Sequence, residues 1–222
     1  MPTPDREALS AFFAIHNTQF NRCLAPGIKC DKTAIRAHSI QNSRTLDLLV
    51  IDNHVIAFRP RASATGITID FNSVGRNEAS TFTGLCPEHD RTIFAPIDRE
   101  TLDATNREQL FLFAYRAVTF ELHAIIEKAV MLQNMYTERV KRGWDPPSEL
   151  SPAGKLATED LLHAFITWRY RAEKFDNDLL SHNYENVESD ILILEDQKPC
   201  IAVSSLFTIE GITKKTILCV LS

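Results

Sequence analysis

Two short-range pairs of cysteine and histidine, far apart in the sequence, constrain this chain more than any other feature. The first pair is Cys23 and Cys30, with six residues between them, and the second is Cys86 and His89, with two. Zinc takes four such ligands in a tetrahedron, usually from two pairs on turns. The sequence therefore predicts one structural zinc ion. The alternative is four unrelated residues, because short motif matches also arise by chance.

His38 lies between the two pairs, in the segment Ala34-Ile-Arg-Ala-His-Ser-Ile-Gln41. Imidazole is the side chain most often used as a general base, because its pKa lies near neutral pH. If the zinc ion frames an active site, His38 is therefore the candidate catalytic residue. Otherwise we interpret it as a packing residue beside the metal.

A cysteine pair, a strand ending in histidine and a final pair that opens a helix together resemble the HNH (ββα-metal) nucleases and their treble-clef zinc relatives. The likeness covers about residues 20–98. The stretches Ala37–Gln41 and Ala79–Phe94 are also similar to bacterial proteins of unassigned role that carry such a domain. The resemblance implies a zinc-bound module near the N-terminus.

The same resemblance implies a role for each matching residue. The structural zinc ligands are the four residues named first, Cys23, Cys30, Cys86 and His89. His38 takes the place of the general base, and Asp90 that of a ligand to a catalytic Mg²⁺ or Mn²⁺ ion. Ala37 stands where the family has a carboxylate, and Ser80 and Thr81 stand where it has an asparagine. The long separation from His38 to Cys86 implies an insertion.

The cysteine usage and the apolar pattern favour a protein of a reducing compartment. The five cysteines cannot all pair, and the N-terminal residues show no basic-then-apolar signal pattern. No apolar run appears long enough in the sequence to span a bilayer. We therefore expect a cytoplasmic protein without membrane contact.

The net charge of -5 is unevenly distributed along the chain. Residues 22–61 contain seven basic residues against three acidic ones, a local excess of four positive charges. A basic patch beside the zinc site is what binding to the phosphates of DNA or RNA requires. A solvated charged surface is the alternative.

The apolar pattern predicts an α+β chain in three segments: a zinc module over 1–100, a helical hairpin over 101–185 and a β-rich end over 186–222. Inside the module we expect a strand over 34–40 and two inserted strands, at 55–58 and 67–71. After an N-terminal helix that reaches Phe20, helices are expected over 43–51, 86–95, 106–142 and 152–182. Pro96 is expected to stop the second of these, and Asn106 and Gly143 to bound the third. C-terminal strands are expected over 190–195, 200–203 and 216–221.

Three functions remain open. The first is a zinc-stabilised nucleic-acid-binding module that acts as an HNH-like endonuclease, with His38 deprotonating water for attack on a phosphodiester. The second is a non-catalytic treble-clef binding or scaffolding protein, which Ala37 favours. The third is a helical interaction protein in which zinc only ties down the N-terminal segment.

Overall fold

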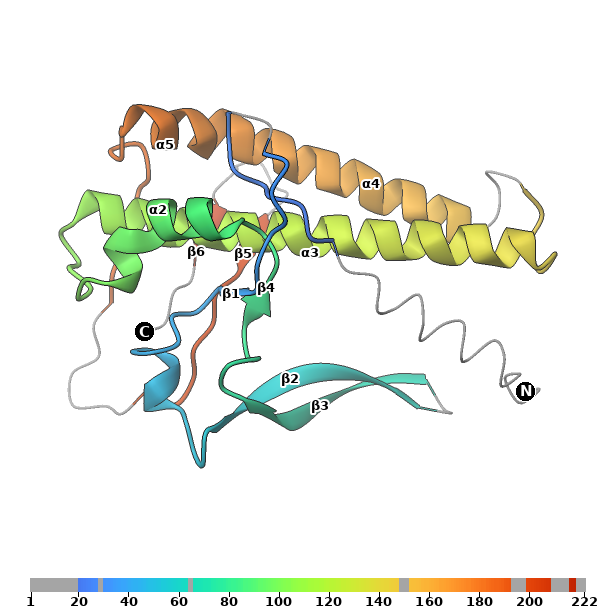
Figure 1. Ribbon diagram of the computed structural model, residues 1–222, viewed down its shortest axis with the longest axis horizontal. Helices are drawn as coiled ribbons and strands as arrows, with labels where there is room; N and C mark the ends of the chain where they lie inside the picture. Colours follow the sequence, from blue (N-terminus) through green and yellow to red (C-terminus); the bar gives the residue numbers. More distant parts are fainter. Residues whose placement is uncertain are drawn as a thin grey trace.

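A computed structural model shows two long antiparallel helices, α3 (Arg107–Lys141) and α4 (Pro152–Arg171), which are the longest elements of the fold (Figure 1). The structure describes residues 20–27, 30–63, 66–147, 152–192, 199–208 and 216–218. The expected N-terminal helix lies outside these ranges, apart from Phe20. Helix α2 (Pro87–Asp98) packs on α3, and small antiparallel sheets complete the molecule. The prediction of an α+β protein is confirmed.

The N-terminal half contains a short strand pair that is interrupted by a hairpin. Strand β1 (Ala37–His38) pairs antiparallel with β4 (Thr81–Phe82), so that His38 stands opposite Thr81. Between them, β2 (His54–Ser63) and β3 (Gly66–Gly75) form a ten-residue ladder that projects away from the helices (Figure 1). The expected insertion is therefore present. In place of the helix expected over 43–51, a single 3₁₀ turn, η1, spans Leu46–Leu48.

The predicted end of α2 at Pro96 is wrong. The helix begins with Pro87 in its first turn, where a missing N–H costs nothing, and continues through Pro96 to Asp98. Pro96 removes only one backbone donor, and the next turn still forms, because Arg99 N–H donates to the Ala95 carbonyl at 3.0 Å. The proline thus lies in the last turn without ending it.

Helix α3 has the ends that the sequence predicts. The Asn106 side chain accepts a hydrogen bond from the Gln109 backbone N–H, as an N-cap does. At the other end Gly143 adopts a positive φ of 71°, which glycine reaches without strain. By length and composition α3 also qualifies as a candidate membrane span, which corrects the expectation that no stretch is long enough. Most of its apolar window is buried inside the protein, as in a core helix. The cytoplasmic location stays a prediction.

The segment expected as one helix over 152–182 is helical over 152–181, but part of it is π-helix and not α-helix. After α4, a π turn, η2 (Ala172–Asp176), leads into α5 (Asn177–Ser181), which ends at His182 in the left-handed region. A π turn aligns residues five apart, and Arg171 and Asp176 form an ion pair with Nε and Oδ1 3.2 Å apart. Both side chains are largely buried. The Tyr115 hydroxyl donates to the same carboxylate at 3.1 Å.

One hydrophobic core joins α2, α3 and the helical end of the chain. Its buried members are Leu85, Phe94, Ile97, Phe111, Leu112, Ala114, Tyr115, Val118, Phe175 and Leu179. Cys23, Leu24 and Ala25 pack against it from the N-terminal side, and Leu206 from the C-terminal side. All three predicted segments therefore contribute to one core. Their division into separable domains stays a prediction.

The C-terminal segment forms a small hairpin of its own. Strands β5 (Leu206–Thr208) and β6 (Thr216–Leu218) pair antiparallel. The strand predicted over 216–221 is thus confirmed at 216–218, and the rest lies outside the described residues. Within the described residues, 190–192 form no strand and 200–203 contain only an isolated bridge at Val203. An apolar run forms a strand only where a neighbouring edge can pair with it, and within the described residues no edge pairs along 190–192.

Candidate metal centre

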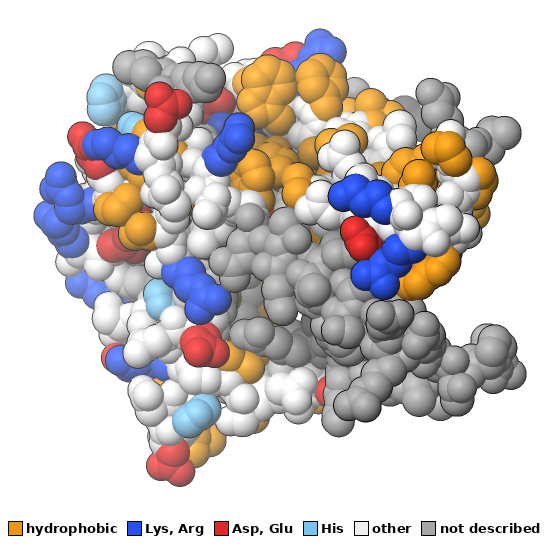
Figure 2. All heavy atoms as spheres, turned by 45° about the vertical axis from the view of Figure 1, so that its right-hand side comes forward, with side chains coloured by type: hydrophobic (Ala, Val, Ile, Leu, Met, Phe, Trp, Pro, Cys, Tyr) orange, Lys and Arg blue, Asp and Glu red, His pale blue; other side chains and the backbone are white. Residues whose placement is uncertain are grey.

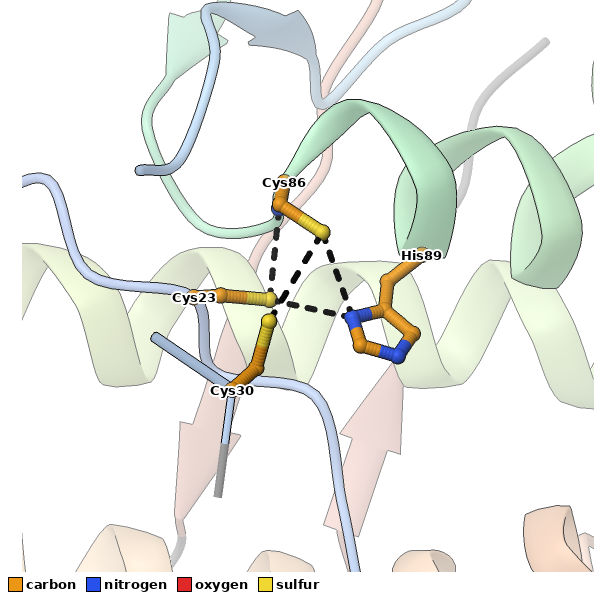
Figure 3. A group of neighbouring side chains, drawn as sticks. All are labelled: Cys23, Cys30, Cys86 and His89. Atoms are coloured by element: carbon orange, nitrogen blue, oxygen red, sulfur yellow. Dashed lines mark hydrogen bonds between the residues drawn. The ribbon is translucent and has the colours of Figure 1, made fainter. Parts of the chain in front are cut away.

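Four side chains from two distant stretches of the chain converge on one point (Figure 3). The ligand atoms of Cys23, Cys30, Cys86 and His89 all lie within 4.8 Å of one another. His89 Nδ1 is 3.3 Å from the Sγ atoms of both Cys23 and Cys86. The Sγ atoms of Cys30 and Cys86 are 3.9 Å apart. The predicted ligand set is therefore brought together, as a possible metal site.

The spacing of these atoms can be compared with a zinc tetrahedron. With Zn–S bonds of about 2.3 Å and a Zn–N bond of about 2.0 to 2.1 Å, the edges of the tetrahedron are roughly 3.8 Å between sulfurs and roughly 3.6 Å between sulfur and nitrogen. The observed separations of 3.9 Å and 3.3 Å lie close to both values. The donor set and its geometry thus fit a four-coordinate metal with no open position.

The loop that carries Cys23 and Cys30 is closed by backbone pairing. An isolated bridge joins Arg22 to Thr33, and Ala34 N–H donates to the Asn21 carbonyl at 2.8 Å. The loop is wider than a usual zinc knuckle, and this bridge brings its two ends together. Gly27 turns the chain inside it with a φ of 81°. The long spacing is therefore compatible with two converging thiols.

The same loop is fastened to the start of α2. Leu24 N–H donates to the Gly84 carbonyl, and Ile35 N–H donates to the Leu85 carbonyl, each at 2.8 Å. Gly84 also has a steric reason to be glycine, because a Cβ there would lie 2.3 Å from the ring of Phe82. These contacts hold the two ligand pairs close to each other.

Cys86 and His89 both belong to the first turn of α2. Cys86 is the N-cap residue, and His89 lies three residues further along, so the two side chains lie on the same side of the helix. Cys86 is completely buried, and its backbone N–H donates to the Cys23 sulfur at 3.2 Å. A thiolate accepts such a bond well, because the N-terminus of a helix favours negative charge.

Two of the three thiols at the centre, Cys23 and Cys86, have opposite pKa shifts. Burial raises the pKa of Cys23 to about 11. Burial acts in the same direction on Cys86, but the backbone N–H of His89 and the neighbouring Cys23 and Cys30 thiols bring its pKa below the usual value. Cys86 therefore loses its proton more readily than Cys23. A bound metal cation would favour the thiolate form of all three.

A buried arginine supports the Cys23 loop from the helical side. Arg171 Nη2 donates to the Leu24 carbonyl at 2.8 Å, while the same side chain pairs with Asp176 across the π turn. This contact could not be predicted from the sequence. The available signal was Arg171 itself, a charged residue within the apolar pattern of a predicted helix. Its partner, Leu24, lies 147 residues away in the sequence.

His38 is half-buried on β1 and has a defined ring orientation. Its Nδ1 lies 3.0 Å from the Ala79 carbonyl oxygen, which can only accept a hydrogen bond, so Nδ1 carries the proton. In the described part of the chain, Nε2 has no hydrogen-bond partner. Burial lowers the pKa of His38, and the charges of Arg116 and Arg76 act in the same direction. The neutral ring therefore leaves the Nε2 lone pair available at neutral pH.

Asp90 lies one residue after the candidate ligand His89, on a half-buried face of α2. Burial raises the pKa of its carboxyl group, while the Arg116 charge opposes this shift and Asp98 adds to it. His38 is influenced by the same two charged residues. Asp90 and His38 therefore lie on different elements but within the field of one ion pair.

This ion pair, between Arg116 and Asp98, was also not foreseen. Arg116 Nη2 donates to both carboxylate oxygens of Asp98, at 2.8 and 2.9 Å, and its guanidinium lies 4.2 Å from the centre of the Phe94 ring. The Arg116 side chain is only 4% exposed. A charged residue inside the apolar stripe of α3 was the available signal.

Several basic residues of the predicted patch already have partners. Lys32 pairs with Glu88, and Arg44 donates to the backbone carbonyls of Arg99 and Glu100. Arg22 and Arg36 are exposed and have no ion-pair partner in the described residues. The positive charge available to a ligand is therefore smaller than the sequence count.

Comparison with family models, curated proteins and solved structures found no match to this chain.

Proposed function

We propose that residues 20–98 form a zinc-stabilised nucleic-acid-binding module in which His38 is the general base of an HNH-like phosphodiester hydrolysis. One observation carries the proposal: the Ala79 carbonyl accepts a hydrogen bond from Nδ1–H of His38, and Nε2 has no hydrogen-bond partner among the described residues. A general base needs an oriented ring with a free lone pair. The resemblance to the HNH nucleases assigns this role to the same residue.

The arrangement around His38 also supports the proposal. β1 carries His38 and pairs with β4, and α2 follows directly with two of the four candidate zinc ligands. The zinc would tie this helix to the 23–30 loop and would take no part in chemistry, since its four ligands leave no position for substrate. A strand pair followed by a helix is the order of the ββα-metal nucleases that the sequence resembles.

In the proposed reaction the residues of the chain have separate tasks. His38 Nε2 takes the proton of a water molecule as that water attacks the phosphorus of a phosphodiester. The lowered pKa of His38 keeps the ring neutral at neutral pH, ready to accept this proton. Asp90 would hold a Mg²⁺ or Mn²⁺ ion, whose chemistry is to stabilise negative charge on phosphate and leaving oxygens. Exposed Arg22 and Arg36 would attract the backbone of DNA or RNA.

A non-catalytic binding or scaffolding module is the second candidate, and a specific observation favours it. Ala37 offers no carboxylate, and the carboxylate of Asp98 is already bound by both oxygens to Arg116. Asp90 is then the remaining candidate ligand for a catalytic ion. A hard divalent cation held by few charged ligands binds weakly, so hydrolysis by this site should need much added metal.

The discriminating experiment incubates the purified full chain with plasmid DNA and with RNA in Mg²⁺ or Mn²⁺. The test variant is His38→Ala, and the matched control is His54→Ala, an exposed histidine on β2 that bonds the Asp52 carbonyl. We expect weak cleavage by the wild type and by His54→Ala, and none by His38→Ala. Ala37→Asp should lower the metal concentration required. Cleavage that persists in His38→Ala excludes His38 as the base.

The dependence of cleavage on pH gives an independent measurement. Burial, Arg116 and Arg76 lower the pKa of His38 from the ordinary value of 6.5, against the Ala79 carbonyl and Asp98. The base form therefore predominates above that pH, and the rate should fall only at lower pH. If no cleavage is seen but salt-dependent binding to DNA or RNA is measured, the non-catalytic module is the better assignment. Without cleavage or binding, both candidates fail.

A further inference from the structure

The outer face of α4 carries large apolar side chains that nothing in the described structure covers. The inner face, with Ala157, Asp160 and Ala164, is buried towards α3. Figure 2 shows hydrophobic side chains gathered along the upper part of the molecule, where α4 lies. The outer apolar strip consists of residues that are 45 to 56% exposed: Leu161, Leu162, Phe165, Ile166 and Trp168.

The spacing of these residues is that of a helix-pairing surface. Leu161, Phe165 and Trp168 are separated by four and three residues, and Leu162 and Ile166 by four. Such steps place side chains in adjacent rows along a helix, as in the seam of two packed helices. A surface helix of a monomer normally turns polar residues outwards, so this strip indicates a partner.

Charged residues stand at both ends of the outer apolar strip. Lys155 and Glu159 precede it, and Arg169 and Glu173 follow it. Within one chain they form two exposed ion pairs, Lys155 with Glu159 at 3.9 Å and Arg169 with Glu173 at 2.6 Å. Exposed pairs of this kind contribute little to the stability of one chain. Read along the helix, their signs alternate: positive, negative, positive, negative.

We infer that the partner is a second copy of this chain, packed through the outer face of α4 in an antiparallel pair, with the two-fold axis level with Ala164 along the helix. In this register Leu162 faces Ile166 of the second copy, and these two side chains bury each other at the centre of the seam. Glu159 then faces Arg169 of the second copy, and Lys155 faces its Glu173. Opposite charges meet at both ends, as in helix pairs whose orientation is set by flanking charges. A parallel pair would place Lys155 against Lys155, which is repulsive.

The size of the surface sets the expected affinity. From residue 155 to residue 173 a helix extends roughly 27 Å, and a single helix pair buries less than the standard interface of about 800 Å² per partner. We therefore expect a reversible dimer with a dissociation constant in the range of about 1 to 100 μM.

The first test measures the mass of the full chain by sedimentation velocity at protein concentrations from about 1 to 100 μM. The wild type should shift from monomer to dimer, and Leu162→Glu should remain a monomer throughout. Leu102→Glu is the matched control, because Leu102 is similarly exposed but lies outside α4. Circular dichroism of each variant checks that the helices are kept. A wild type that is monomeric at every concentration overturns the inference, as does a dimer that Leu162→Glu leaves intact.

The second test exchanges the charges. Glu159→Arg and Arg169→Glu each place like charges together at both ends of the pair, and each should weaken the dimer about tenfold. The double variant restores opposite charges between the copies while both pairs within the helix stay broken, so it should dimerise nearly as well as the wild type. An equimolar mixture of the two single variants should also recover dimers, as mixed pairs. If neither recovers, the proposed register is wrong.

Discussion

The candidate metal centre and the core around α3 differ in how they bring parts of the chain together. At the centre, four donor atoms bring together segments that are 56 to 66 residues apart, next to strands of only two residues. In the core, ten buried side chains from helices and their flanks share the packing. The centre thus depends on a few atoms, whereas the core depends on many contacts. Loss of one ligand should therefore disrupt the whole centre. Loss of one core side chain should remove only part of the packing in the core.

The two regions meet at the 23–25 segment. Cys23 is a candidate metal ligand, and Cys23, Leu24 and Ala25 also pack against the core. Arg171 joins them further, through its hydrogen bond to the Leu24 carbonyl. Substitutions on either side of this segment show whether the two regions are stabilised separately.

Loss of the metal should have the largest effect. Cys86→Ser removes a completely buried ligand, and structural zinc contributes about 10 to 16 kcal/mol in small zinc domains. We expect the metal content to fall to near zero and residues 20–40 to lose protection from hydrogen exchange, while α3 and α4 keep most of theirs. Elemental analysis and hydrogen exchange with mass spectrometry measure both effects.

Cys200→Ser is the control for this experiment, because Cys200 is an exposed cysteine outside the cluster. It should leave the metal content unchanged. Protein purified without added metal that contains no zinc, or equal zinc in the Cys86 and Cys200 variants, contradicts the assignment of the centre.

Opening a cavity in the core should have the next largest effect. Phe111 is completely buried and packs against the rings of Tyr115, Phe175 and Tyr184. Phe111→Ala should lower the free energy of unfolding by about 3 to 5 kcal/mol, as measured by urea denaturation. The zinc content should stay at the wild-type level. Loss of zinc in this variant would show that the two regions are not stabilised separately.

Removing one member of the buried ion pair should have a moderate effect. Asp98→Ala leaves the Arg116 charge buried and unpaired, which costs about 3 to 5 kcal/mol in a dry site. Because Asp98 is 38% exposed, we expect roughly half of that loss in the free energy of unfolding. The double variant with Arg116→Met should recover part of the stability. If the double variant is less stable than Asp98→Ala, the Arg116 charge must have another partner once Asp98 is removed.

Removing the N-cap of α3 should have the smallest effect. Asn106→Ala deletes the acceptor for the Gln109 N–H and should lower the free energy of unfolding by about 1 kcal/mol. Asn106→Asp keeps an acceptor and should stay close to the wild type. Thermal denaturation with both proteins at one concentration measures the difference. An equal loss in both variants would point to a role other than capping.

The parts of the structure that the sequence predicted have local causes. The two ligand pairs signal a metal cluster because cysteine and histidine at those spacings have few other uses in such a chain. The ends of α3 follow from Asn106 and Gly143, whose side-chain and backbone properties act within one turn. The inserted strands follow from two short apolar runs, at 55–58 and 67–71. These inferences needed no knowledge of the tertiary contacts.

The parts that were missed depend on distant partners. Strand formation at 206–208 rather than at 190–192 depends on which segment finds a pairing edge. The burial of Arg116 depends on the position of Asp98 on another helix. The continuation of α2 past Pro96 depends on its packing against α3, where Gln109 Nε2 donates to the Pro96 carbonyl at 3.2 Å. Each outcome is decided by tertiary contact, which overrides local propensity.

The π turn at Ala172–Asp176 gives the chain an unusual sensitivity to length. A π turn holds about one residue more than a turn of α-helix, so deleting one residue there would leave an acceptable helix. The deletion would, however, rotate the following residues by roughly 100°, which turns Phe175 and Leu179 away from the core and separates Arg171 from Asp176. Among descendants of this sequence, surface loops are free to gain or lose residues. The candidate metal loop at residues 23–30, however, depends on an unchanged number of residues in the π turn, because Arg171, which supports this loop, lies 147 positions after Leu24.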